Sequence, residues 1–238
     1  MSEKEKIEII PAVLPRSWKE LGEGLERMRG VTRRVQIDIV DGHFAHGKTW
    51  PYKDGEKFAA IVEQEHGLPF WEELDFEFDL MVADPAEAFM DYIHAGASRI
   101  IVHATSSTAV HAAQQLIDLN EESGSFSLQV GVALGAHQSP DDLEPFESQY
   151  DFVQVMGIEH EGKQGESFDP DNKALFLLER LRRRYPLLPL QVDGGVRLDN
   201  VAQLVAAGAT RLIAGSAIFG APDAAAAYKE LYNRANAQ

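Results

Sequence analysis

Three aspartates stand near the ends of apolar runs that have the length of buried strands: Asp38 in QIDIVDGH, Asp79 in EFDLM and Asp193 in QVDGG. Burying a carboxylate is costly unless it is paired or bound to a cation, and neighbouring carboxylates repel one another. We therefore expect that one or more has a raised pKa, that a metal ion lies among them, or that one points out to water. Asp38 and Asp193, each flanked by apolar residues and followed closely by glycine, are our preferred candidates for chemistry.

Glycines follow the last two strand-like runs and indicate an anion site. Gly194 and Gly195 come directly after Asp193, and Gly215 and Ser216 come directly after the final run. Backbone without side chains lets a ligand approach closely, and its free N–H groups bind anions. In barrel folds, a phosphate frequently lies between the loops that follow the seventh and eighth strands. The sequence therefore predicts that these four residues bind a phosphate group.

These candidates can meet only if the runs that carry them lie side by side. Eight strand-like runs alternate with eight helix-like patterns, which indicates a parallel sheet. The predicted strands are Ile7–Val13, Arg34–Val40, Leu74–Val82, Ser98–His103, Ser127–Leu134, Asp151–Met156, Leu188–Asp193 and Arg211–Ala214, and the predicted helices are Trp18–Arg29, Lys53–His66, Pro85–His94, Thr108–Glu122, Pro140–Glu147, Asn172–Tyr185, Leu198–Ala207 and Asp223–Ala235. Eight pairs in 238 residues favour a closed barrel over an open doubly wound sheet. We predict an α/β fold, a single (β/α)8 TIM barrel, with residues 1–238 as one domain.

The composition limits the partners of the chain. With 38 acidic and 22 basic side chains, the net charge is −16, which repels phosphate backbones and argues against nucleic acid as a partner. The absence of cysteine excludes disulfides and thiolate metal sites and fits a cytoplasmic enzyme. The charged first residues show no apolar core of a signal peptide, and no run is long enough to span a membrane. An anionic ligand must therefore be held by local backbone donors.

Taken together, these segments resemble the ribulose-phosphate 3-epimerase family over nearly the whole chain. The motifs that carry the resemblance are VDGHF at 40–44, DLMV at 79–82, VH at 102–103, SF at 167–168, VDGGV at 192–196 and AGSAIF at 214–219. The resemblance implies an isomerase that interconverts ribulose 5-phosphate and xylulose 5-phosphate through an enediolate. Asp38 and Asp193 match the family's acid and base at carbon 3, with a metal between them. A small phosphorylated sugar as partner, substrate contacts by Met81 and His103, and a homo-oligomer are implied as well.

The sequence departs from the family at the metal site. The two histidine ligands of the family are replaced by Gln36 and Asp79, so that Gln36, Asp38, Asp79 and Asp193 form an all-oxygen set. Such a set suits Mg²⁺ or Mn²⁺ better than Zn²⁺, or it holds no metal. The polar segment 157–168, which replaces a glycine-rich loop of the family, is either a lid over the ligand or a mobile solvated loop. Two alternatives therefore stay open: an isomerase or lyase acting on another phosphosugar, and a non-catalytic phosphosugar-binding protein.

Overall fold

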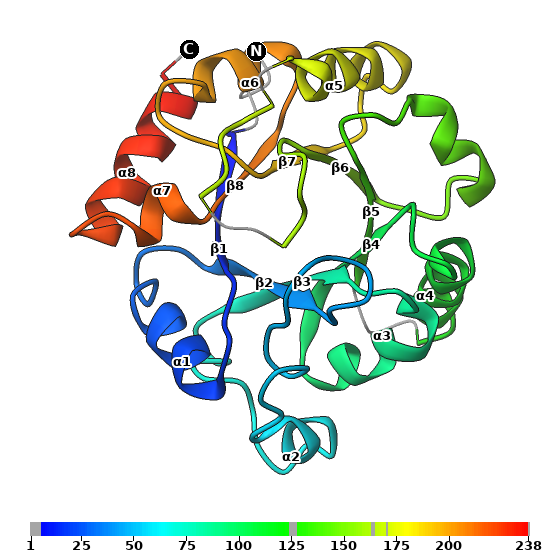
Figure 1. Cartoon of the computed structure of the whole chain (residues 1–238), viewed down its shortest axis with the longest axis vertical. Helices are drawn as coiled ribbons and strands as arrows, with labels where there is room; N and C mark the ends of the chain where they lie inside the picture. Colours follow the sequence, from blue (N-terminus) through cyan, green and yellow to red (C-terminus); the bar gives the residue numbers. More distant parts are fainter. Residues whose placement is uncertain (1–5, 124–127, 163–164, 170, 238) are drawn as a thin grey trace.

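Eight parallel strands close into a barrel in chain order, and the last strand returns to pair with the first (Figure 1). The protein is seen here in a computed structural model that describes residues 6–123, 128–162, 165–169 and 171–237. The strands are β1 Glu8–Val13, β2 Arg34–Val40, β3 Asp75–Met81, β4 Ala97–His103, β5 Gln129–Leu134, β6 Phe152–Met156, β7 Leu190–Asp193 and β8 Arg211–Ala214. The predicted (β/α)8 barrel is confirmed. Each predicted strand overlaps an observed one, although Ser127, in the predicted fifth strand, lies outside the described residues.

The connections between strands lie on the outside of the barrel (Figure 1). The helices are α1 Trp18–Glu26, α2 Phe58–Val62, α3 Pro85–His94, α4 Ala109–Ser123, the 3₁₀ helix η1 Pro140–Phe146, α5 Lys173–Arg184, α6 Val201–Ala207, α7 Ser216–Phe219 and α8 Ala224–Ala235. Within the described ranges, no helix combines the length and the hydropathy needed to cross a membrane.

The helices depart most from the prediction in three places. The helix predicted over 53–66 contracts to α2, because Lys57 and Gln64 on either side adopt φ angles of 66° and 62°, which a right-handed helix cannot continue. The helix predicted over 140–147 is the 3₁₀ helix η1, in which Pro145 has no N–H to donate. The sequence pattern also does not predict α7, a single turn that follows β8 directly.

The inside of the barrel is polar at its base, unlike the apolar layer between strands and helices. The guanidinium of Arg99 donates to the Glu77 carboxylate at 3.2 Å, and these side chains are 6% and 0% exposed. The guanidinium groups of Arg99 and Arg211 both lie over the Phe152 ring, 5.8 Å and 4.8 Å from its centroid. Burial and the neighbouring Arg99 lower the pKa of Arg211 to about 10. The base of the barrel is thus filled by paired charges around one aromatic ring.

Glu8 joins four strands at this base. Its carboxylate contacts Arg34 of β2 at 2.6 Å, Arg99 of β4 at 3.3 Å and Arg211 of β8 at 3.6 Å. Burial opposes the charged form of Glu8, but the three arginines outweigh it and lower the pKa of this carboxyl. The ion pairs of Glu8 therefore bridge the seam where β1 meets β8.

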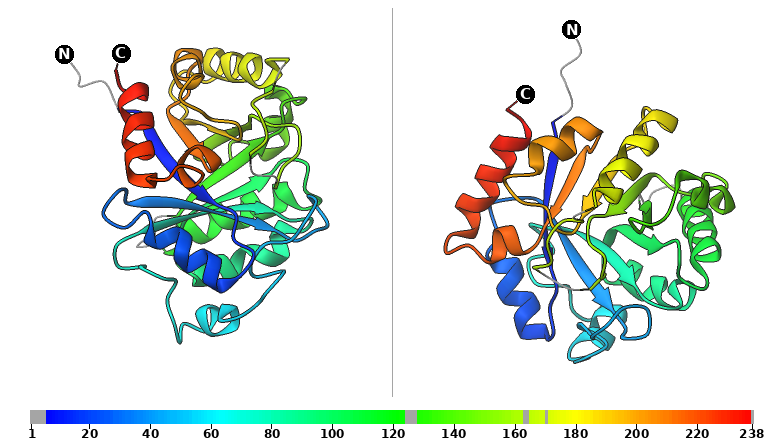
Figure 2. Two further views of the ribbon diagram at one scale, coloured as in Figure 1. Left: turned by 60° about the vertical axis from the view of Figure 1, so that its left-hand side comes forward. Right: turned by 45° about the horizontal axis from the view of Figure 1, so that its top comes forward.

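Helix α8 lies beside the first strand, so that the ends of the described chain come together (Figure 2). The side chain of Asn236 links them: its Oδ1 accepts from the N–H of Ile7 at 2.8 Å, and its Nδ2 donates to the Ile7 carbonyl at 3.1 Å. Both contacts lie at the end of the barrel where the strands begin. The candidate site lies at the opposite end of the barrel, where the strands finish.

Candidate active site

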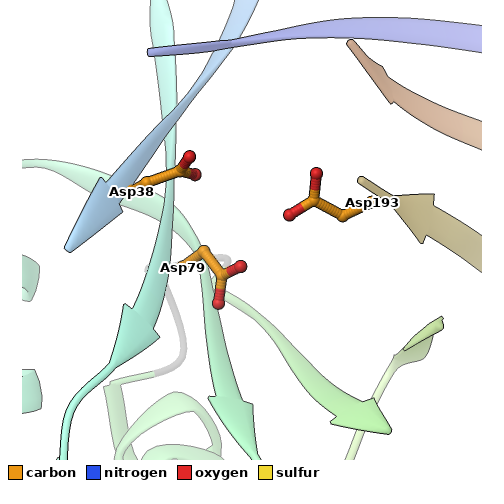
Figure 3. Close-up of side chains that lie close together, drawn as sticks. All are labelled: Asp38, Asp79 and Asp193. Carbon is orange, nitrogen blue, oxygen red and sulfur yellow. The ribbon is translucent and has the colours of Figure 1, made fainter. Parts of the chain in front are cut away.

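Three aspartate side chains converge at the mouth of the barrel, where the strands end (Figure 3). Asp38 and Asp79 lie side by side in register on β2 and β3, and Asp193, the last residue of β7, faces them from across the mouth. Each offers an oxygen atom, and these atoms lie within 4.8 Å of one another. Asp38 and Asp79 are buried, and Asp193 is partly buried. The strand ends thus bring together three carboxylates that are far apart in the sequence.

Burial and mutual repulsion raise the pKa of two of these carboxyls. Burial, followed by the charges of Asp193 and Asp79, raises the pKa of Asp38 well above its ordinary value. Burial and the charge of Asp79 raise the pKa of Asp193 to about 7. A carboxyl with such a pKa can both release and accept a proton near neutral pH. The raised-pKa alternative drawn from the sequence is therefore favoured by the geometry.

Asp79 is held on both of its oxygen atoms by neighbouring side chains. Nε2 of His103, at the end of β4, lies 2.8 Å from Oδ1, and Nε2 of Gln154 on β6 donates to Oδ2 at 2.9 Å. Burial alone would lower the pKa of His103, but the charge of Asp79 outweighs it, so that this pKa is raised. The ring of Phe44 lies 4.9 Å from that of His103 and helps to cover the pair. Asp79 thus lies beside an imidazole whose protonated form it stabilises.

Gln36 lies between the other two aspartates. Its Nε2 donates to Oδ1 of Asp38 at 2.8 Å and to Oδ2 of Asp193 at 3.2 Å. The amide nitrogen, rather than the amide oxygen, therefore faces the carboxylates in this structure. As a consequence, Gln36 could serve as a metal ligand only after its amide turned over to present the oxygen.

The donor chemistry of the three carboxylates fits a hard divalent cation. Asp38, Asp79 and Asp193 present only oxygen atoms, which suit Mg²⁺ or Mn²⁺ more than Zn²⁺. Carboxylate oxygens carry further lone pairs, so that the hydrogen bonds to Asp79 do not exclude an additional ligand bond. The site is therefore an acidic group that could hold a metal ion.

A cavity joins the carboxylates of Asp38 and Asp193 to the loops after β7 and β8. Its lining includes the predicted site residues Asp38, Met81, Asp193, Gly194, Gly195, Gly215 and Ser216. Gly194 and Gly195 adopt φ angles of 97° and 68°, which glycine tolerates far better than other residues. A Cβ at Gly195 would lie 2.5 Å from the backbone of Phe168. A side chain at position 195 would therefore clash with the backbone of Phe168, which explains why glycine stands there.

Described residues of the segment 157–168, which follows β6, also contribute to this cavity. Gly162, Gly165 and Glu166 line it, while Lys163 and Gln164 lie outside the described residues. A Cβ at Gly162 would lie 3.2 Å from the Val40 side chain, so that the segment approaches β2 across the mouth. The described residues of this segment therefore lie at the mouth of the barrel, and its role as a lid stays a prediction.

Sequence reasoning overlooked one side chain of this site. Gln154 stands in the apolar run FVQVM, and its position two residues from both Phe152 and Met156 places all three on the inner face of β6. That alternation was the available signal. Asp41 shapes the turn after β2, since it accepts from the N–H groups of His43 and Phe44 at 2.7 and 2.9 Å.

Comparisons with known proteins show the family of the chain. The model of the ribulose-phosphate 3 epimerase family matches residues 8–219. The chain is 35% identical over 214 residues to the ribulose-phosphate 3-epimerase of Schizosaccharomyces pombe, covering 90% of this chain and 87% of that one. It is 28% identical over 226 residues to the ribulose-phosphate 3-epimerase of Aquifex aeolicus, covering 94% of each.

Solved structures support the fold. A structure of KGPDC from Streptococcus mutans superimposes with a TM-score of 0.70 at 15% identity, covering 98% of both chains. A 3-hexulose-6-phosphate synthase superimposes with a TM-score of 0.66 at 21% identity, covering 96% of this chain and 99% of that one. At these identities the likeness concerns the barrel alone.

Proposed function

Because the chain belongs to the ribulose-phosphate 3-epimerase family, we propose that it interconverts ribulose 5-phosphate and xylulose 5-phosphate by removing and returning a proton at carbon 3. The observation that carries the proposal is the pair of carboxyls with raised pKa, Asp38 and Asp193, on opposite sides of one cavity. Inversion at a carbon needs an acid and a base on its two faces. A pair of carboxyls of which one keeps its proton supplies both.

In the proposed reaction, Asp38 and Asp193 exchange roles with the direction of turnover. The ionised carboxylate removes the proton from carbon 3, which leaves an enediolate, and the protonated carboxyl returns a proton to the opposite face. Burial raises the pKa of both carboxyls, and the charges of neighbouring aspartates raise them further, which favours retention of a proton on one of the two near neutral pH. Gln36, which donates to both, holds them at the two sides of the cavity. We further propose that Met81 forms the apolar wall beside the sugar carbons and that His103 contacts the sugar end remote from the phosphate.

We also propose that Asp38, Asp79 and Asp193 hold Mg²⁺ or Mn²⁺. Gln36, the fourth ligand expected from the sequence, is not included in this set, because its amide presents N–H groups to the carboxylates. The all-oxygen set within 4.8 Å supports this choice. When bound, a divalent cation supplies positive charge beside the developing oxyanion.

The phosphate of the sugar is proposed to bind at Gly194, Gly195, Gly215 and Ser216. The cavity extends from Asp38 and Asp193 to these residues, and α7 begins there. The N–H groups of Ile218 and Phe219 donate to the Gly215 carbonyl, which leaves those of Ser216 and Ala217 at the start of the turn for an anion. Because the net charge of the chain is −16, such local donors must supply the attraction for an anion.

Replacing Gly195 with alanine is expected to raise the KM for ribulose 5-phosphate at least about tenfold, the effect of losing roughly one good hydrogen bond to a charged group. The added Cβ would lie 2.5 Å from the backbone of Phe168 and would displace the loop that carries the phosphate donors. Steady-state kinetics measures the effect. Gly22→Ala in α1 is the matched control, since a Cβ there meets nothing within 4 Å. An unchanged KM in Gly195→Ala would contradict the placement of the phosphate.

Deuterium exchange tests the activity itself. The protein is incubated with ribulose 5-phosphate in D₂O with EDTA, Mg²⁺, Mn²⁺ or Zn²⁺, and NMR follows deuteration at carbon 3. We expect deuterium at carbon 3 and the appearance of xylulose 5-phosphate, with Mg²⁺ or Mn²⁺ supporting the reaction better than Zn²⁺. Binding without exchange under every condition would contradict the epimerase and indicate a phosphosugar-binding protein. Elemental analysis that finds zinc in good yield would contradict the proposed choice of metal.

Three further expectations from the sequence stay proposals. The absence of cysteine supports a cytoplasmic location, and membership of the family supports a homo-oligomer. A barrel that uses strands from β1 to β8 supports the treatment of residues 1–238 as one domain.

A further inference from the structure

Below the aspartates, four buried side chains form a polar layer across the barrel: Gln36, Glu77, Gln154 and Gln191, each fully buried. Nε2 of Gln191 lies at its centre. This nitrogen donates to Oε1 of Glu77 at 2.8 Å and to Oε1 of Gln154 at 2.7 Å, and it lies 3.4 Å from Oε1 of Gln36. The layer therefore connects the charged base of the barrel to the carboxylates at its mouth.

The direction of the hydrogen bonds in this layer is set from the base. A guanidinium only donates, so Arg99 makes Oε2 of Glu77 an acceptor, and the other oxygen of that carboxylate accepts as well. Gln191 must therefore turn its NH₂ group, not its carbonyl, toward Glu77. Turning the amide of Gln191 over would place its oxygen against three other oxygen atoms.

This orientation is kept although it leaves a buried polar atom without a partner. Among the described residues, Oε1 of Gln191 has no hydrogen-bond donor. An unsatisfied buried carbonyl is costly, so the three acceptors around Nε2 must outweigh that cost. The orientation of Gln191 is thus a consequence of its surroundings, and it fixes the orientation of the two glutamines beside it.

The amides of Gln154 and Gln36 extend the same donor-to-acceptor order to the carboxylates at the mouth of the barrel. An amide that turns its oxygen toward Gln191 turns its NH₂ group to the opposite side. The NH₂ group of Gln154 accordingly meets Asp79 at 2.9 Å, and that of Gln36 meets Asp38 at 2.8 Å and Asp193 at 3.2 Å. All three carboxylates at the mouth therefore receive amide donors.

We propose that Gln191 is a positioning residue for the epimerase reaction, because it makes amide N–H groups rather than amide oxygens face the three carboxylates. The inference rests on the proposed function of Asp38 and Asp193. Hydrogen bonds from N–H groups hold these carboxylates at fixed places and stabilise their ionised forms. Amides that faced them with oxygen would repel them and displace the acid and the base from carbon 3.

A charge-neutral exchange tests this directly: the double variant Glu77→Gln/Gln191→Glu. It keeps the net charge and nearly the same volume, but places an acceptor at the centre of the layer. Gln154 and Gln36 must then turn their NH₂ groups inward and their oxygens toward the mouth. We expect kcat to fall about a hundredfold, as for loss of correctly placed acid–base groups, with a KM within about threefold of the wild type because the phosphate loops are untouched.

A readout that does not depend on activity accompanies the kinetics. In ¹⁵N-labelled protein, the side-chain NH₂ signals of Gln36 and Gln154, assigned with Gln36→Leu and Gln154→Leu, are expected downfield and protected from exchange with water. In the double variant these signals move, while the melting temperature is recorded to separate reorientation from unfolding. Gln191→Met is a second variant that removes the central donor without adding a charge. Gln203→Glu, on the exposed face of α6, controls for a new carboxylate.

The outcomes separate the hypotheses. Moved amide signals with a lower kcat support the positioning role, and Gln191→Met is expected to fall between the wild type and the double variant. Wild-type kcat, or a lower kcat with unmoved signals in both variants, overturns it. If the wild-type protein shows no exchange at carbon 3, the proposed function fails, whereas the NMR signals still report whether Gln191 orients the amides.

Discussion

Replacing Asp193 with asparagine is expected to lower the conversion of ribulose 5-phosphate into xylulose 5-phosphate at least about a hundredfold, the usual contribution of a general acid or base. Asparagine keeps the shape of the side chain but can neither accept nor release the proton. Because asparagine leaves the shape of the side chain beside the phosphate glycines unchanged, the KM should change much less than kcat. NMR measures the formation of xylulose 5-phosphate. The variant Asp38→Asn is expected to show the same loss.

The control for this prediction is Asp199→Asn, which makes the same chemical change at an exposed position shortly after Asp193 in the chain. Its rate of conversion should equal that of the wild type. Wild-type formation of xylulose 5-phosphate in either Asp193→Asn or Asp38→Asn would refute the assignment of that residue as acid or base, whereas exchange without inversion needs only the remaining base. If a variant lost both phosphosugar binding and exchange, the substitution would instead have disturbed the whole mouth of the barrel.

Replacing Arg99 with leucine is expected to destabilise the protein by about 3–5 kcal/mol, the effect of removing one partner of a buried ion pair. The change leaves the fully buried Glu77 carboxylate without its cation, and Gln129 and Glu8 lose donors at 2.7 Å and 3.3 Å. Urea denaturation measures the free energy of unfolding.

Two companion variants show whether the charge pair is responsible. Arg33→Leu removes a largely exposed partner of Asp75 and should cost less than about 1 kcal/mol. Arg99→Leu/Glu77→Leu removes both charges and should recover much of the loss, since an apolar pair needs no cation. A loss in Arg99→Leu no larger than that in Arg33→Leu would contradict the role of the buried pair.

The positions of the reacting groups were predictable because they follow from periodic patterns. The two-residue period of side-chain direction in a strand placed Gln36 and Asp38 on one face of β2, and parallel strands necessarily bring their ends to one mouth. The glycines after β7 and β8 were predictable for the same reason. The short extent of α2 was not, because Lys57 and Gln64 are ordinary helix formers whose left-handed conformations are imposed by the surrounding structure.

The side chains that contact the reacting groups could not be predicted from the sequence. The contact of Asp79 with His103 joins neighbouring strands, but that with Gln154 spans the barrel across 75 positions of the chain. The orientation of the Gln36 amide depends on Gln191, 155 positions away, and through it on Glu77. Periodicity tells which face a side chain occupies, whereas such pairings depend on how the barrel closes.

The ion pairs of Glu8 have a consequence for the folding of the chain. Arg34 is close to Glu8 in sequence, but Arg211 reaches it only when β8 pairs with β1. The complete cluster cannot exist in a partly built sheet, so it forms after the barrel has closed and contributes little to the folding transition state. Its contacts therefore act mainly on the rate of unfolding, and they keep the closed barrel from opening at the seam between its first and last strands.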